Sequence, residues 1–470
     1  MIPRYPFPVP GLAFLPDLLL ADGALRAGAA LSVRDGKVVA AGAPAAGFQK
    51  VPLRGRILLP GFVSAHGHAF QRALRGRAER RRQDGSTFWS WRESMYAVAE
   101  RLGPDGLEAV ARLAFLELAR AGVTCVGEFH YLHRDPAGRP YANPSELALR
   151  VVRAARSVGL RIALLRAGYG RAGAGGPPAA AQRRFVEESP DAYLAGLAHL
   201  AGAVEGDPLV SLGVAPHSVR ACPPEWLCAL AAEADRRALP LHVHAAEQPA
   251  EVAACRAEHG TSPVGLLARA GALGPRTTLV HAIHLDDADV DAIGAARATV
   301  CACPLTERNL GDGIVPADRL AAAGARLALG VDAHVEADPL GEARALELHL
   351  RLARGTRAVL DEPPGGLAPA LLEALTAGGM ASLGLSGGRL APGDPADFVL
   401  LDTDDPSLAG ASGESLLAAI LLGASPAAVK STFVAGEPIL EDGWPAPGRP
   451  AGAEILERYR RAVVDLWGAA

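Results

Sequence analysis

Two histidines separated by one glycine follow an apolar run near the start of the chain. The run covers residues 58–63 and leads into His66 and His68. In an extended strand alternate side chains share a face, so this pair would point the same way and could hold one metal ion. A strand end with two hydrogen-bonded histidines explains the pair equally well, because short motifs also occur by chance. Further ligands at other strand ends would decide between these interpretations.

Residues able to bind a metal or move a proton recur after later apolar runs. Apolar, β-rich runs begin near residues 57, 123, 161, 209, 239, 277, 298 and 326. Most of the thirteen histidines lie close to the ends of these runs, together with Glu128, Glu247 and Asp332. Scattered structural histidines would not gather in this way. The clustering therefore favours a metal site over the purely structural interpretation.

The elements that would position these residues alternate between two patterns. Each apolar run is followed, in most cases, by an Ala-, Leu- and Arg-rich stretch with helical periodicity. Eight such units predict an α/β fold, a TIM-like (β/α)8 barrel over residues 57–387, with its functional groups at the carboxyl ends of the strands. An open doubly wound sheet is the alternative, but it would normally show a Gly-rich phosphate turn, and none is obvious.

The two ends of the chain have a different composition, typical of short strands and turns. Residues 30–40 form a hairpin pattern with Asp35-Gly36 as its turn, and strand-like segments return at 388–402 and 431–436. Neither end is long enough to bury a core alone. We expect residues 1–56 and 388–450 to form one small composite β-sandwich, and residues 451–470 to form a C-terminal helix.

Composition excludes several classes of partner. The chain has 470 residues and a net charge of −4 with both signs interspersed, so we expect neither nucleic acid nor a membrane as partner. The six cysteines form no Cys-x-x-Cys pair, which indicates buried thiols in a reducing compartment. No signal-like start and no membrane-spanning run is present. We expect a cytoplasmic protein that acts on a small molecule.

Five short motifs along the chain together resemble those of a known enzyme superfamily. They are the segments 66–73 (HGHAFQRA), 127–133 (GEFHYLH), 215–220 (APHSVR), 242–248 (HVHAAEQ) and 309–314 (NLGDGI). With these motifs the chain resembles the amidohydrolase superfamily and, within it, the formimidoylglutamate deiminases. The resemblance runs along essentially the whole chain. It implies a metal-dependent barrel joined to a sandwich built from both termini, and a homodimer.

The resemblance also implies roles for individual residues. The ligands of one divalent ion would be His66, His68, His244 and Asp332; Zn²⁺ suits this mixed set, with Fe²⁺ or Mn²⁺ as alternatives. Glu247 would carry protons, His281 would be a second acid/base or water-orienting group, and Asp332 would also hold the attacking water. The carboxylates of the substrate would be bound by Gln71, Arg92, Tyr131, His217 and Arg220.

The implied reaction is hydrolysis of N-formimidoyl-L-glutamate, a dicarboxylate amidine, to N-formyl-L-glutamate and ammonia in histidine degradation. A deaminase of a purine, pterin or related heterocycle is the alternative within the superfamily. A catalytically silent barrel protein is a third possibility, which the complete set of ligands and proton-carrying residues argues against.

Four residues are left without an assigned role. We expect His242 to be a hydrogen-bonded core histidine and His284 and His334 to lie behind the site or in its loops. Arg166 would alter substrate preference if its side chain pointed into the barrel mouth.

Overall fold

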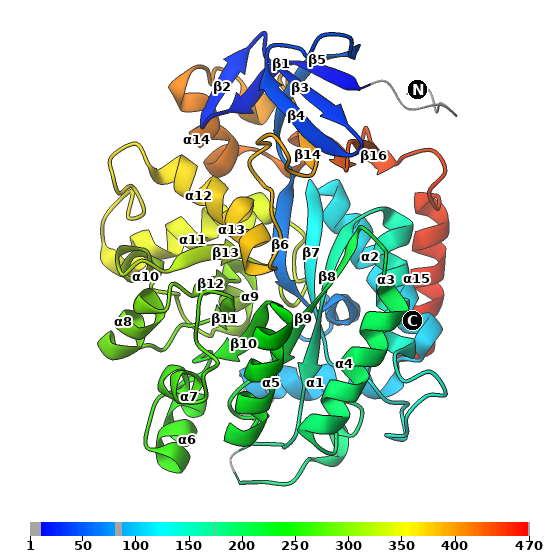
Figure 1. Ribbon diagram of the computed structural model, residues 1–470, viewed down its shortest axis with the longest axis vertical. Coiled ribbons are helices and arrows are strands. Elements are labelled where there is room, and N and C mark those ends of the chain that lie inside the picture. Colours follow the sequence, from blue (N-terminus) through cyan, green and yellow to red (C-terminus); the bar gives the residue numbers. More distant parts are fainter. Residues whose placement is uncertain (1–10, 80–86, 174, 469–470) are drawn as a thin grey trace.

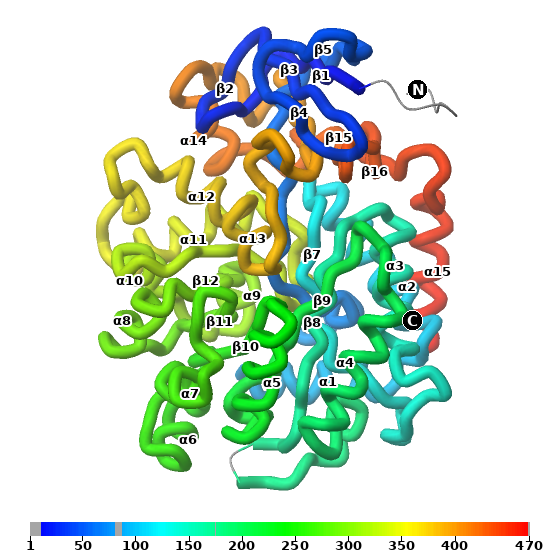
Figure 2. Tube along the Cα trace, in the orientation of Figure 1, coloured from blue at the N-terminus to red at the C-terminus, as the bar shows by residue number. Residues whose placement is uncertain are grey.

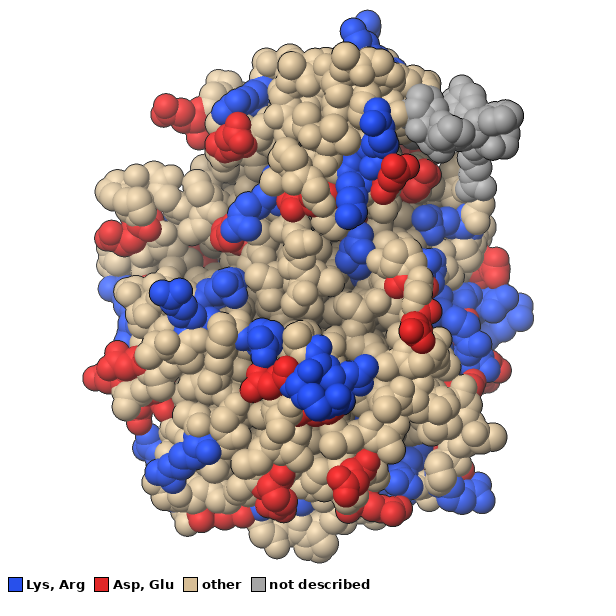
Figure 3. Space-filling view, viewed as in Figure 1, with Lys and Arg blue, Asp and Glu red and all other residues tan. Residues whose placement is uncertain are grey.

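The computed structural model describes residues 11–79, 87–173 and 175–468. The first ten residues of the expected segment 1–56, and the last two of 451–470, lie outside this description. The described chain forms two sheets, a parallel barrel surrounded by helices and a sheet of mixed strands at one end of it (Figure 1). On the face seen in Figure 3, acidic and basic side chains are interspersed.

The barrel consists of eight strands that follow each other in chain order, each pairing in parallel with the next. They are β6 (Phe62–Gly67), β7 (Val123–His130), β8 (Arg161–Gly168), β9 (Val210–Pro216), β10 (Leu241–Ala245), β11 (Thr277–His281), β12 (Thr299–Ala302) and β13 (Arg326–Leu329). Sequential parallel strands separated by helices are the arrangement of a (β/α)8 barrel. The predicted fold class is therefore confirmed.

The predicted start of the first barrel strand is wrong. Ile57 belongs to β5 (Gln49–Pro60) of the other sheet, and β6 begins only at Phe62. Gly61 separates the two strands, and a Cβ atom there would lie 2.3 Å from the side chain of Thr124. The last four residues of β5 and all of β6 are buried, so these two apolar stretches, separated by one residue, look like a single run in the sequence.

The barrel closes between β6 and the residues that follow β13. Gly67 and Asp332 form a parallel bridge, in which the backbone N–H of Asp332 donates to His66 O at 3.2 Å and that of His68 donates to Asp332 O at 3.0 Å. Gly330 allows this approach, since a Cβ there would lie 2.7 Å from His66 O. The closure thus joins the strand ends that carry His66, His68 and Asp332.

Helices cover the outside of the barrel and many of them start at proline, which suits the first turn because it has no N–H to leave unpaired. Their bounds are α1 (Phe88–Arg101), α2 (Pro104–Arg120), α3 (Glu146–Val158), α4 (Pro190–Val204), α5 (Pro224–Arg237), α6 (Pro249–His259), α7 (Pro263–Arg269), α8 (Asp287–Ala295), α9 (Pro304–Leu310), α10 (Ala317–Ala322), α11 (Pro339–Arg354), α12 (Leu367–Leu375), α13 (Ala377–Ser382), α14 (Glu414–Gly423) and α15 (Gly452–Trp467). Four short 3₁₀ segments are η1 (Ala69–Leu74), η2 (Ala180–Gln182), η3 (Pro406–Leu408) and η4 (Pro426–Ala428).

The second sheet takes strands from both termini, which Figure 2 shows side by side at one end of the molecule. Its strands are β1 (Leu12–Ala21), β2 (Ala24–Ala27), β3 (Ala30–Arg34), β4 (Lys37–Gly42), β5, β14 (Phe398–Asp402), β15 (Val429–Val434), β16 (Glu437–Glu441) and β17 (Trp444–Pro445). The predicted hairpin is β3–β4, where Asp35 and Gly36 have φ angles of 50° and 72°, as a tight two-residue turn requires.

This sheet is continuous but curls over its own core. The edge strand β4 reaches the residues just before β14, since Val38 N–H donates to Asp394 O at 2.9 Å and Gly393 N–H donates to Val38 O at 2.8 Å. The rings of Phe14, Phe398 and Phe433 pack inside the curl, with centroids 4.4–5.7 Å apart. Strands of both termini thus form one small β structure, as expected, and its core lies inside a single curled sheet.

A buried ion pair joins the terminal sheet to the barrel. Arg161, at the start of β8, donates through Nε at 3.0 Å and Nη2 at 3.2 Å to the carboxylate of Asp397. The same carboxylate accepts the N–H of Ala435 at 2.7 Å.

Within the described ranges, no helix has the length and apolar character needed to cross a membrane.

Candidate active site

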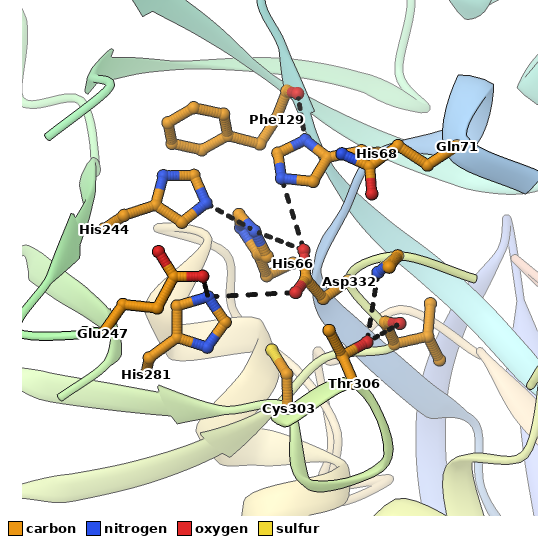
Figure 4. Close-up of polar contacts among 12 residues, drawn as sticks. His66, His68, Gln71, Phe129, His244, Glu247, His281, Cys303, Thr306 and Asp332 are labelled. Atoms are coloured by element: carbon orange, nitrogen blue, oxygen red, sulfur yellow. Dashed lines mark hydrogen bonds and ion pairs between the residues drawn. The ribbon is translucent and has the colours of Figure 1, made fainter. Parts of the chain in front are cut away.

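Three histidines and one aspartate converge at the carboxyl end of the barrel strands. His66 lies in β6 and His68 directly follows this strand, His244 lies in β10, and Asp332 belongs to the residues after β13 (Figure 4). Their ligand atoms all lie within 4.8 Å of one another. Asp332 Oδ1 lies 3.3 Å from Nε2 of both His66 and His68, and Nε2 of His66 and His244 are 3.2 Å apart. The structure therefore gathers all four of the expected metal ligands.

Backbone carbonyls fix the orientation of two of these rings. His68 Nδ1 donates to Phe129 O at 2.9 Å, and His244 Nδ1 donates to His217 O at 2.8 Å. A neutral imidazole carries one proton, so Nε2 of each ring is left as a lone pair that points into the cluster. Metal-binding histidines are usually oriented in this way by the other ring nitrogen.

The electrostatics of the cluster suit a cation at its centre. Burial lowers the pKa of His66 to about 3 and also lowers the pKa of His68 and His244, so the three rings are neutral near pH 7. Burial would raise the pKa of Asp332, but the neighbouring His66 holds it below its ordinary value. Two ring nitrogens 3.2 Å apart would repel each other unless a positive charge lay between them. One carboxylate and three lone pairs are the donor set that Zn²⁺ accepts.

Glu247 and His281 lie beside the cluster. His281 Nε2 is 3.6 Å from Glu247 Oε1 and 3.8 Å from Asp332 Oδ2, while its Nδ1 donates to Glu307 Oε1 at 3.2 Å. Burial alone would lower the pKa of His281, but the three surrounding carboxylates raise it well above its ordinary value. A protonated imidazole next to a carboxylate is a pair that can donate and accept protons at one place.

The cluster opens into a pocket with about 530 Å³ of empty volume. All five residues expected to bind substrate line this pocket together with the cluster: Gln71, Arg92, Tyr131, His217 and Arg220. Gln71 Nε2 donates to the hydroxyl of Tyr131 at 2.9 Å, and Oε1 of Gln71 is buried without a partner among the described residues. The expected site residues thus line one cavity, except His66, which is fully buried behind it.

Two guanidinium groups give this pocket its positive charge. Arg92 on α1 packs over the rings of Trp89 and Tyr96, at 4.5 Å and 5.5 Å from their centroids. Arg220 is nearly buried, and its Nη2 donates to Glu247 Oε2 at 3.2 Å. Burial alone would lower the pKa of Arg220, but the nearby carboxylates of Glu251 and Glu247 raise this pKa above its ordinary value. Arg220 therefore stays charged and bridges the pocket to Glu247.

Aromatic residues from outside the expected motifs form much of the pocket wall. They are Phe88, Trp91 and Tyr96 of α1, Tyr169 after β8, and Phe185. Gln182 fixes two of them, because its Nε2 donates to the hydroxyls of Tyr96 at 3.1 Å and Tyr169 at 2.8 Å. The sequence shows the aromatic character of these segments, but it does not show that they fold back over the barrel mouth.

The four residues without an assigned role lie outside the pocket lining. His242 is fully buried and its Nε2 donates to Ser382 O at 2.8 Å. Nε2 of His284 donates to Asp312 O at 2.9 Å. Arg166 forms a buried two-pronged ion pair with Glu187, at 2.9 Å and 2.6 Å. The side chain of Arg166 therefore points away from the barrel mouth.

Two buried acids near the site were missed by sequence analysis. Glu307, on α9, accepts from His281, and Glu251, on α6, accepts the N–H of Glu247 at 3.2 Å. Burial raises the pKa of both carboxyls. An acid in a helix that follows a ligand-bearing strand was the available signal, but many surface helices carry the same residue type.

The barrel, the His/Asp cluster and the adjacent Glu247–His281 pair are the features of the class of hydrolases built on a (β/α)8 barrel with a metal site at its mouth. Residues 57–439 match the model of the amidohydrolase family. The chain belongs to the amidohydrolase family.

Relatives within this family act on different molecules. A formimidoylglutamate deiminase of Pseudomonas aeruginosa is 42% identical over 417 residues, which cover 88% of this chain and 89% of that protein. An 8-oxoguanine deaminase of the same organism is 32% identical, covering 79% of this chain and 80% of that protein. The crystal structure of an amidohydrolase from Brucella melitensis is 33% identical and superimposes with a TM-score of 0.87, covering 97% of this chain and 99% of that chain.

Proposed function

We propose that the protein hydrolyses N-formimidoyl-L-glutamate to N-formyl-L-glutamate and ammonia. The observation that carries this proposal is the pocket itself, in which Arg92 and Arg220 lie in one cavity with Glu247 and three residues of the cluster, His68, His244 and Asp332. Two guanidinium groups suit a substrate with two carboxylates. The 42% identity to a formimidoylglutamate deiminase supports the same substrate.

The proposed cofactor is one Zn²⁺ ion bound by His66, His68, His244 and Asp332. A divalent ion at these four side chains would lower the pKa of a water molecule toward neutrality and so provide a nucleophile. The neutral rings, their inward Nε2 atoms and the charged Asp332 support this assignment.

In the proposed reaction water adds to the formimidoyl carbon and the bond from this carbon to the terminal nitrogen breaks. Glu247 accepts one proton from the water at Oε1 and passes it to the terminal nitrogen. It then transfers the second water proton from the new hydroxyl to the same nitrogen as the C–N bond breaks, so that ammonia departs and the formyl oxygen comes from water. His281, 3.6 Å from Glu247, orients this carboxylate and stabilises its charge. Gln71, Tyr131 and His217 hold the substrate carboxylates together with the two arginines.

The test is ammonia release by the purified, zinc-loaded protein. N-formimidoyl-L-glutamate should be turned over faster than N-formimidoyl-L-aspartate, because one methylene changes the distance between the carboxylates. A panel of adenine, guanine, 8-oxoguanine and pterins serves as the comparison, with Glu247→Gln as the matched inactive variant. Turnover of a heterocycle without turnover of the linear amidine would refute the substrate assignment.

Deamination of a heterocycle is the second candidate function. The aromatic wall of Phe88, Trp91, Tyr96 and Phe185 could stack on a flat ring, and the 8-oxoguanine deaminase at 32% identity supports such a substrate. The two pocket arginines favour the dicarboxylate.

The homodimer and the expected lack of nucleic-acid and membrane partners stay predictions.

A further inference from the structure

The segment that carries Asp332 has an unusual backbone. Asp332 and His334 both have positive φ angles, 45° and 53°, within three residues. Few residues other than glycine adopt this left-handed conformation, and although Asp and His do so more often than most, it is held at a conformational cost. Contacts from outside the segment must therefore keep Asp332 in place.

On the side of the cluster these contacts come from the barrel. The segment bonds to the backbone of His66 and His68, as described for the closure. The hydroxyl of Thr306 donates to Val331 O at 3.1 Å and accepts Ala333 N–H at 3.2 Å (Figure 4). These bonds hold the residues on both sides of Asp332, but they do not reach the second strained residue, His334.

On the outer side Arg75 holds the carbonyl of His334, whose N–H donates within the segment to Val331 O at 3.1 Å. Arg75 donates through Nε at 3.0 Å and Nη2 at 2.7 Å to the carbonyl oxygen of His334. The ring of His334 is buried, and its Nε2 would lie 3.3 Å from a Cβ placed on Gly67, between the ligands His66 and His68. Arg75 therefore fixes a peptide that packs directly against both ligand-bearing segments.

Arg75 is itself held by a short chain of charges. Glu117 on α2 accepts from Arg75 Nη1 at 3.1 Å and from both Nε and Nη2 of Arg72 at 2.8 Å. Arg72 Nη1 in turn donates to the hydroxyl of Tyr459 on α15 at 2.9 Å, and its guanidinium packs over that ring. Arg72 belongs to η1, the segment that follows His68, and Arg75 is the next residue after η1.

The chemistry explains why an arginine is needed at each position. Only a guanidinium offers two parallel N–H donors in a fixed plane, so it can fix the direction of a carbonyl, whereas an ammonium group cannot. Glu117 separates two cations that would otherwise repel each other. All three side chains are largely shielded from solvent, which strengthens their interaction relative to an exposed pair.

We propose that Arg75 is a positioning residue that fixes the metal ligand Asp332 through the peptide of His334, and that Glu117, Arg72 and Tyr459 keep Arg75 oriented. The C-terminal helix α15 thereby supports the metal site from the outside of the barrel. The proposal depends on a divalent ion at the cluster and not on the identity of the substrate.

The test measures how fast zinc-loaded full-length protein loses its ion to a chelator. Arg75→Met should release zinc about 10–100 times faster than wild type, the range found when groups that orient metal ligands are removed. Arg75→Lys should lie between the two, because it restores the charge but not the paired donors. Tyr459→Phe removes one bond at the end of the chain and should accelerate release only a few-fold.

The matched control is Arg161→Met, which removes another buried arginine–carboxylate pair at the opposite end of the barrel. Its melting temperature should fall, but its zinc release at 25 °C should equal that of wild type. Equal release from wild type and Arg75→Met, or equal acceleration by Arg161→Met, would overturn the proposal. A wild-type chain that binds no divalent ion would overturn it as well. If Arg75→Met does not fold, Tyr459→Phe and Glu117→Gln give the decisive comparison.

Discussion

Buried polar groups at the two ends of the barrel differ in how completely they are hydrogen-bonded. At the amino ends of the strands Arg161 and Asp397 form an ion pair with two hydrogen bonds. The carboxylate of Asp397 also accepts the backbone N–H of Ala435. At the carboxyl ends several buried polar atoms have no hydrogen-bond partner among the described residues, including Gln71 Oε1 and Arg220 Nε, although Arg220 Nε lies 3.8 Å from Glu251 Oε2. Polar groups with complete hydrogen bonding stabilise a fold, whereas groups with an unused donor or acceptor at a cavity are available for a ligand. The comparison predicts that changes at the mouth affect activity and changes at the base affect stability.

The largest expected effect is at the mouth. Glu247→Gln should lower turnover by about 10³-fold or more, because it removes a general acid/base group, while zinc content and melting temperature stay close to wild type. Ammonia release and metal analysis of the same preparation check this. An active Glu247→Gln protein would contradict the role of Glu247 as the proton carrier.

The next effect belongs to the base of the barrel. Arg161→Met should lower the free energy of unfolding by about 3–5 kcal/mol, since it leaves Asp397 buried without its cation. The turnover per folded molecule should not change at 25 °C. Urea unfolding and initial rates measure the two quantities, and a variant with normal stability but impaired turnover would break the proposed division between the ends.

A smaller effect separates the two pocket arginines. In the described part of the chain the guanidinium of Arg92 pairs with no carboxylate, so Arg92→Met should raise KM by about 10–100-fold, equal to the loss of one charged hydrogen bond, with little change in kcat. Arg220 also contacts Glu247, so Arg220→Met should lower kcat in addition. Steady-state kinetics with N-formimidoyl-L-glutamate distinguish the two patterns, and an unchanged KM for Arg92→Met would remove that residue from substrate binding.

The smallest effect concerns pH. Burial raises the pKa of Glu128 from 4.5 to about 8, although its carboxylate oxygens accept the N–H of Ala69. The folded chain therefore holds a proton that the unfolded chain has lost between about pH 5 and pH 8, and the free energy of unfolding should fall as pH rises through this range. Glu128→Gln should reduce this fall by an amount on the order of 1–3 kcal/mol. Urea unfolding at pH 5.5 and pH 8.5 measures it, and an identical fall in both proteins would contradict the raised pKa.

The sequence predicted the fold because its main features are local. The alternation of apolar and helical stretches located the barrel strands. The Asp35-Gly36 pair predicted the turn of the β3–β4 hairpin, because both residues adopt positive φ angles there. The convergence of His66, His244 and Asp332 followed from the general rule that parallel strand ends meet at one edge of a barrel.

Other features depend on contacts between distant segments and could not be predicted. The side chain of Arg166 points away from the barrel mouth and bonds to Glu187. Which side chains of a strand point to the mouth depends on the register of all the barrel strands, and one segment of sequence does not show that register. The contact of Glu307 with His281 depends on where α9 begins after β12. The link from Tyr459 to Arg72 joins residues 387 positions apart, and no short pattern encodes it.

The terminal sheet imposes an order of events during synthesis of the chain. Strand β5 pairs with β1 on one side and with β14 on the other, so one edge of β5 stays without its partner until residues 398–402 have been made. At 5–20 residues per second this interval lasts roughly 20–70 s. An apolar strand with a free edge is a template for pairing with other chains. The free edge of β5 therefore stays open to such pairing until β14 has been made.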